Sequence, residues 1–92
     1  MSTFEELDRL SSQELHDRAI HRATRHLDIK FLWKLMGALP AAEAAAGRIG
    51  EADADVQHAS AVVADAFREG TPEVQDALRP IFIEYLLEHD DT

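Results

Sequence analysis

The stretch Ile29-Lys-Phe-Leu-Trp-Lys-Leu-Met-Gly-Ala-Leu39 decides the fold that we expect for this chain. On a helix its apolar side chains point in nearly every direction, and only Lys30 and Lys34 carry a charge. A helix that is apolar all round must be covered on more than one side. A second segment of this kind, Ile81-Phe-Ile-Glu-Tyr-Leu-Leu87, lies near the end of the sequence. We therefore expect a helical bundle that buries the two segments against each other and against a second copy of the chain.

Two capping boxes mark the starts of the first two helices, Thr3-Phe-Glu-Glu6 and Ser11-Ser-Gln-Glu14. In this motif the hydroxyl accepts a hydrogen bond from the amide three residues later, and the carboxylate reaches back to the first residue. The motifs predict a short first helix and a second helix that starts at about residue 12. We expect the second helix to continue to Gly37, because Gly37 and Pro40 both disfavour helical geometry there.

A three-to-four spacing of apolar residues then predicts a third helix, from residue 41 to about residue 69. Its periodic positions are Ala42, Ala45, Ile49, Ala52, Val56, Ala59, Val63 and Ala66. Because small residues let a neighbour approach closely, we expect tight antiparallel packing against the second helix. A fourth helix opens at Thr71-Pro72-Glu73, and Pro80 is expected to kink it. The predicted fold class is all-α: a small antiparallel helical bundle, with a short N-terminal helix plus three longer helices, in a single domain over residues 1–92.

The composition excludes several classes of site. The 92 residues include no cysteine, so a disulfide framework, a thiolate zinc site and a thiol nucleophile are all excluded. The N-terminus lacks the pattern of a signal peptide, and no apolar run approaches the roughly 20 residues that a membrane span needs. We expect a cytoplasmic protein that does not enter a membrane.

The formal charge of −9 is unevenly distributed. Residues 1–39 hold as many basic as acidic side chains, whereas acidic side chains greatly outnumber basic ones in residues 40–92. A basic strip on the second helix comprises Arg18, Arg22, Arg25, Lys30 and Lys34. Such a strip could follow a phosphate backbone, but an acidic chain repels nucleic acid overall, so we do not expect nucleic acid as a partner. One alternative is nevertheless a regulator that contacts nucleic acid or a nucleic-acid-binding protein.

A second alternative is a metal-binding enzyme built from carboxylate and histidine ligands. Asp55 and His58 are three residues apart, the spacing of a carboxylate and an imidazole in carboxylate-bridged di-iron bundles. Such a site needs the same motif on another helix and further carboxylates, and these are not evident. His16, His21 and His26 fan around a helix and cannot converge on one ion, so we expect them at the surface. We predict no cofactor and no metal site, because the sequence contains no recognisable catalytic motif.

The function that we predict is a small acidic helical interaction module without catalytic activity of its own. It is expected to form a homodimer and to bind another protein. The expected interface consists of the apolar residues that we do not expect a single bundle to cover, namely Ile29, Trp33, Met36, Phe82 and Leu86.

Overall fold

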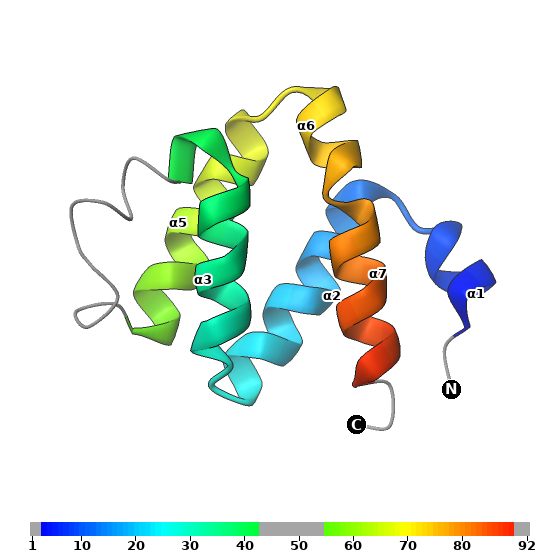
Figure 1. The fold of residues 1–92 in the computed structure, drawn as a ribbon, viewed down its shortest axis with the longest axis horizontal. Coiled ribbons are helices and arrows are strands. Elements are labelled where there is room, and N and C mark those ends of the chain that lie inside the picture. The colour runs from blue at the N-terminus through cyan, green and yellow to red at the C-terminus, as the bar shows by residue number, and fades with distance from the viewer. Residues whose placement is uncertain (1–2, 43–54, 90–92) are drawn as a thin grey trace.

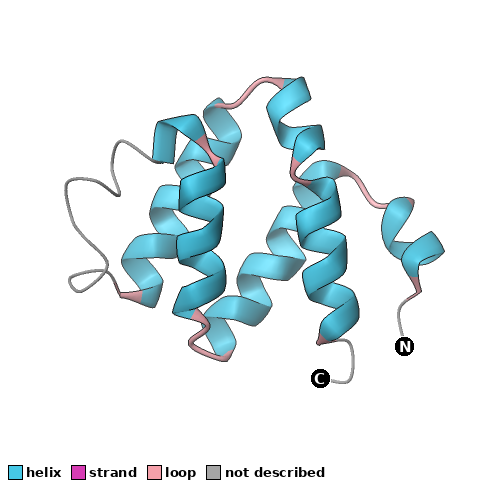
Figure 2. Ribbon diagram, viewed as in Figure 1, coloured by secondary structure: helices cyan, strands magenta, loops and turns pink. Residues whose placement is uncertain are grey.

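The computed structural model describes residues 3–42 and 55–89, and every regular element in these two ranges is a helix (Figure 2). The all-α prediction is therefore confirmed for the described part of the chain. None of the helices in that part combines the length and the apolar character needed to cross a membrane.

The first two helices begin where the capping boxes place them. Helix α1 spans Phe4–Asp8, and the Thr3 hydroxyl accepts a hydrogen bond of 3.2 Å from the Glu6 amide. Helix α2 spans Ser12–Arg25, and the Ser11 hydroxyl accepts one of 3.1 Å from the Glu14 amide. Each cap satisfies an amide that has no partner inside its helix.

The predicted second helix is broken near its middle. Helix α2 ends at Arg25 and helix α3 spans Ile29–Ala38, so one continuous helix from residue 12 to Gly37 is wrong. Leu27 adopts a left-handed conformation with φ of 54°. The Asp28 amide donates back to the Ala23 carbonyl at 2.8 Å, as in a Schellman helix end. The Asp28 carboxylate then caps α3 by accepting a 3.2 Å hydrogen bond from the Phe31 amide.

The predicted third helix is also not continuous. Residues 40–42 are helical, but Asp55 is extended and helix α5 spans Val56–Glu69. The predicted positions Ala45, Ile49 and Ala52 lie outside the described residues. Within α5 the expected core positions Ala59, Val63 and Ala66 are buried.

The last part of the chain forms two helices instead of one kinked helix. Helix α6 spans Pro72–Ala77 with Thr71 as its N-cap, and helix α7 spans Arg79–Glu88. Leu78 separates them, and Pro80 lies in the first turn of α7. Proline is tolerated there because the amide that it lacks would have had no helical partner.

The helices pair in the same direction, α2 with α7 and α3 with α5 (Figure 1). Arg79 at the start of α7 donates to Ser12 at the start of α2, and Tyr85 in the last turns of α7 reaches Asp28, just beyond α2. Likewise, the first residues of α3 and α5 line one hollow, with Ile29 beside Val56. The predicted antiparallel packing therefore does not describe α5 and its main neighbour α3, which run side by side in the same direction.

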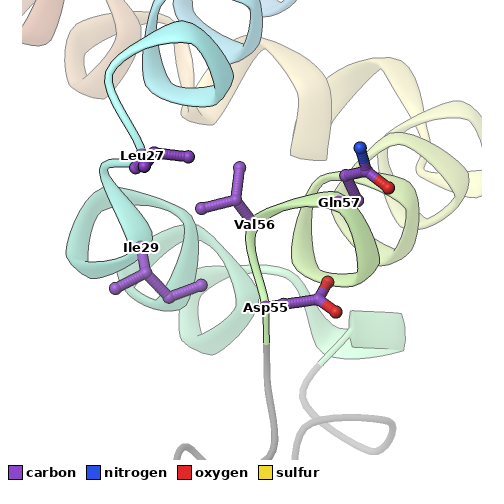
Figure 3. A pocket seen from close by; sticks show the side chains of 5 residues that line it. All are labelled: Leu27, Ile29, Asp55, Val56 and Gln57. Atoms are coloured by element: carbon purple, nitrogen blue, oxygen red, sulfur yellow. The ribbon is translucent and has the colours of Figure 1, made fainter.

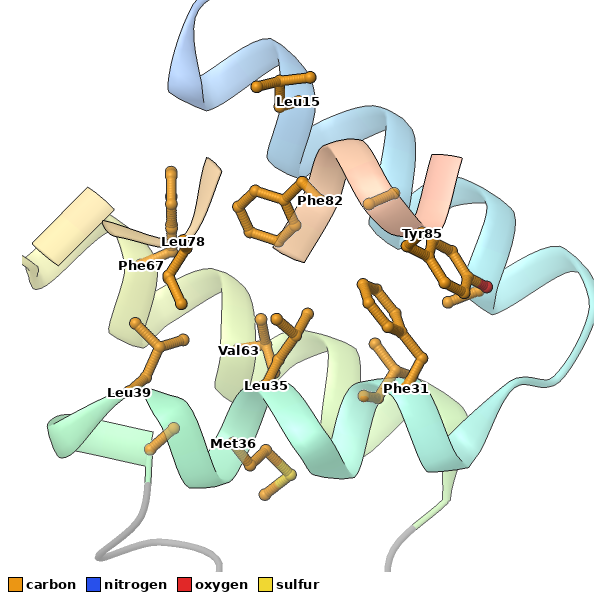
Figure 4. Close-up of a cluster of buried hydrophobic side chains, with 14 of the residues drawn as sticks. Leu15, Phe31, Leu35, Met36, Leu39, Val63, Phe67, Leu78, Phe82 and Tyr85 are labelled. Carbon is orange, nitrogen blue, oxygen red and sulfur yellow. The ribbon is translucent and has the colours of Figure 1, made fainter. Parts of the chain in front are cut away.

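The core lies between these two pairs (Figure 4). Met36 and Phe82, both predicted at an intermolecular interface, are fully buried inside the protomer. The reason is that several helices of the same chain cover α3 and α7, so the second apolar face does not need another copy. The largest buried side chains are Phe67, Phe82, Leu7, Leu15, Leu32, Leu35, Met36, Leu39 and Val63.

Candidate interaction surface

The turn between α2 and α3 exposes a large apolar side chain. Leu27 is 72% exposed, and its backbone is the only non-glycine backbone with positive φ in the described residues. For an L-residue with a β-carbon this conformation costs roughly 1–2 kcal/mol, and glycine or asparagine adopts it more readily. Leucine at this position therefore serves neither the core nor the backbone.

Leu27 is one wall of a hollow of about 480 Å³. The other described lining residues are Ile29 at the start of α3 and Asp55, Val56 and Gln57 at the start of α5. Figure 3 shows Leu27 and Val56 pointing toward each other, with Ile29 next to them at the start of α3 and the polar pair on the α5 side. We call Leu27, Ile29 and Val56 the turn surface.

Basic side chains lie next to the turn surface. Arg25, His26 and Lys30 are exposed, and none of them forms an ion pair with another described residue. Helices α3 and α5 both begin at this end of the molecule, and a helix N-terminus carries a partial positive charge. The capping carboxylates of Asp28 and Asp55 offset part of that charge.

The predicted basic strip is not uniform. Arg18, Arg25, Lys30 and Lys34 are exposed, whereas Arg22 is half-buried. The Arg22 guanidinium donates a 3.1 Å hydrogen bond to the Tyr85 hydroxyl, which in turn donates one of 2.9 Å to Asp28. Arg22 thus joins α2 to α7, and its Nε is buried without a partner among the described residues.

Tyr85 is held on both of its sides. Its ring stacks on Phe31 with centroids 3.6 Å apart, while its hydroxyl lies between Arg22 and Asp28. Burial raises the pKa of the phenol above its ordinary value of 10.0, because the phenolate would lose hydration. The neutral phenol can both accept from Arg22 and donate to Asp28, so this joint needs the protonated form.

His16 is buried, which corrects the prediction that all three histidines of α2 and its end lie at the surface. Its ring stacks on Phe67 at 4.5 Å and meets the edge of Phe82 at 5.9 Å. Nδ1 lies 3.1 Å from the Asp17 carboxylate, and Nε2 has no partner among the described residues. Burial lowers the pKa of the imidazole below its ordinary value of 6.5. His21 and His26 are exposed, as predicted.

Asp55 and His58, the weak metal candidates, form a helix cap. The Asp55 carboxylate accepts a 2.6 Å hydrogen bond from the His58 backbone amide, and both residues are exposed. Among residues 3–42 and 55–89, no group of three or more histidine, cysteine or acidic side chains is placed to hold a metal ion. The spacing of three that suggested a ligand pair is equally the spacing between an N-cap and the amide that it accepts from.

The remaining interface candidates, Ile29, Trp33 and Leu86, are half-buried and pack against the core. Their contact with a second copy stays a prediction. Sequence reasoning missed Leu27, although one signal was present: Asp28 is a good N-cap residue three positions before Phe31. Comparisons with protein-family models, with curated proteins and with solved structures gave no match.

Proposed function

We propose that this protein is a small helical interaction module without catalytic activity, and that it binds a protein partner through the turn surface. The observation that carries the proposal is the exposed Leu27 at positive φ. The left-handed backbone ends α2, but that role does not need an exposed leucine, and a residue type that the fold does not require is a reason to look for a functional one.

The free energy gained by burying Leu27 is comparable to the cost of its left-handed backbone. Complete burial of a leucine side chain contributes about 1.5–3 kcal/mol, and much of the Leu27 side chain remains available for burial. Burial against a partner would offset the cost of the left-handed backbone. Ile29 and Val56 beside Leu27 extend the apolar contact, and the hollow can receive a side chain of the partner.

The proposal is tested by replacing Leu27 with a photo-crosslinking amino acid and irradiating the cells that make the protein. We expect a covalent adduct, whose mass identifies the partner. Ala61 is an exposed position on α5 and serves as the matched control site, where no such adduct should form. If residue 27 gives no adduct beyond that seen at residue 61, the turn surface is not a binding site.

A substitution separates binding from folding. Leu27→Asn suits the left-handed conformation, so it should leave the helix content unchanged and raise the unfolding free energy by up to about 1 kcal/mol. With a crosslinker at the neighbouring exposed His26, the same change should strongly reduce the adduct. An undiminished adduct would mean that the leucine side chain does not contact the partner.

A further inference from the structure

We propose that the partner at the turn surface is a second copy of this chain, docked about a two-fold axis so that the last turns of α7 in each copy lie against the turn surface of the other. This inference rests on the proposed function, because it uses the same surface. It adds the identity of the partner and the segment of that partner, the last turns of α7, that contacts the turn surface.

The two halves of the contact lie at the same end of the molecule. Helix α2 ends there, helices α3 and α5 begin there, and α7 ends there (Figure 1). The hydrogen bond of 2.9 Å from Tyr85 to Asp28 joins the last turns of α7 to the α2–α3 turn. The α2–α3 turn and the last turns of α7 are therefore neighbours at this end of the molecule.

The last turns of α7 offer an apolar side chain between acidic ones. Leu87 is 38% exposed, and Glu84 and Glu88 are exposed beside it. In the described part of the chain, Leu27 and Leu87 are two of only three large apolar side chains that are exposed. The third, Phe4, begins α1, a helix that packs against α7.

The basic side chains beside the turn surface are complementary to the acidic ones beside Leu87, and the carboxylates of Asp28 and Asp55 already accept hydrogen bonds at helix caps. Arg25 and Lys30 flank the turn surface, whereas Glu84 and Glu88 flank Leu87, and no described residue forms an ion pair with any of the four. A two-fold axis through this end brings the basic segment of each copy to the acidic segment of the other, so both favourable contacts form at once. Such a dimer is closed, because the used end of each copy offers nothing further to bind.

The geometry also explains how a chain of charge −9 can associate with itself. The α2–α3 turn belongs to the half of the sequence in which basic and acidic residues balance, while α7 belongs to the strongly acidic half. The pairing places these unlike segments together. Added salt should weaken the dimer, because it screens exposed charges.

The test is a charge exchange, measured as molecular mass by sedimentation equilibrium at micromolar concentration. The wild-type protein should show a dimer of twice the 10.3 kDa chain mass. Lys30→Glu and Glu88→Lys should each raise the dissociation constant roughly tenfold, because each turns two attractions into repulsions. An equimolar mixture of the two variants should restore association as a heterodimer, in which every basic segment again meets an acidic one.

A control and a second arm make the outcome decisive. Glu69→Lys makes the same charge change at the far end of α5 and should leave the dimer unchanged, and circular dichroism should show that all variants remain helical. A monomeric wild-type protein, or a mixture that does not recover, would overturn this inference. If the crosslinker at residue 27 then captures a different protein, the proposed function stands without the dimer. No adduct of any kind would remove both.

Discussion

The α2–α7 pair and the α3–α5 pair both run in one direction, but different chemistry joins them. Hydrogen bonds connect α2 to α7 at both ends, through Ser12 with Arg79 and through Arg22 with Tyr85. No side-chain hydrogen bond joins α3 to α5 in the described residues, and the buried side chains of these two helices are all apolar. The first pair is thus fixed by directional contacts and the second by the fit of its side chains.

The two kinds of contact have different effects. Hydrogen bonds fix how two helices are aligned, and apolar burial supplies most of the free energy that holds them together. A hydrogen bond is satisfied only at one alignment of two helices, and an unpaired buried donor is costly, so the polar joints select the alignment of α2 and α7. Apolar burial contributes more free energy but is not directional. The small Ala59 and Ala66, both buried on α5, therefore limit the alignment of α5 by close packing.

The largest expected effect concerns the residue that connects the two pairs. Phe67 of α5 is fully buried, stacks on His16 of α2 and meets Phe82 of α7. Phe67→Ala should lower the unfolding free energy by about 3–5 kcal/mol, measured by urea denaturation. Phe4→Ala, at a 56% exposed position, is the control and should change little. Equal losses for the two variants would contradict the packing described for Phe67.

A larger side chain at a buried position of α5 tests how tightly the apolar core around this helix is packed. Ala59 is fully buried on α5, so Ala59→Leu should cost about 1–3 kcal/mol of unfolding free energy by forcing side chains and backbone to move. Ala61→Leu introduces the same side chain at an exposed position of the same helix and should be nearly neutral. If Ala59→Leu leaves the thermal midpoint unchanged, the core around Ala59 is loosely packed.

A smaller loss of stability is expected when the hydrogen bonds between Arg22, Tyr85 and Asp28 are removed. Tyr85→Phe keeps the ring stacked on Phe31 but removes the hydroxyl between Arg22 and Asp28, which should cost about 1 kcal/mol. Because the folded pKa of Tyr85 is raised, wild-type stability should also fall as the pH rises above 10.0, where the unfolded chain ionises first. Denaturation curves of the variant should lack this part of the alkaline loss. An unchanged alkaline profile would assign the loss to other groups.

The smallest effect that we expect is a loss of stability in acid that arises from His16. Its folded pKa is lowered, so the stability that it contributes is present above the unfolded value of 6.5 and is lost as the pH falls through the folded value. Urea denaturation at several pH values should show this loss in the wild-type protein and in His21→Gln, but not in His16→Gln. His21 is exposed, so its substitution is the matched control. An acid loss that survives in His16→Gln would arise from another residue.

The sequence predicted the features that depend on neighbouring residues. The caps at Thr3, Ser11 and Thr71 form as expected because each needs only a side chain and an amide three positions away. The break at residues 26–28 was harder to predict. Asp28 caps α3 in the same way, but a Schellman end usually carries glycine where this chain has Leu27, so no sequence signal marks the end of α2.

Contacts between distant segments were harder to predict. A segment that is apolar all round must be covered, but the pattern does not say whether helices of the same copy or of another copy cover it. For Met36 and Phe82 the protomer itself provides the cover. His16 shows the same limit for a polar residue, because only the rings of Phe67 and Phe82, more than fifty positions away, make its burial favourable.

The left-handed residue between α2 and α3 also folds α3 back onto its own chain. If Leu27 became helical, Ser12 to Ala38 would form one rod about 40 Å long. The rod would carry α3 away from α2 and α7 of its own chain, and the apolar surface of α3 would then need the core of a neighbour. This is the route to domain swapping, in which identical segments are exchanged between copies. In such an exchange position 27 would be the hinge. We expect alanine there, which favours helix, to promote exchange, and glycine to hold the chain folded on itself.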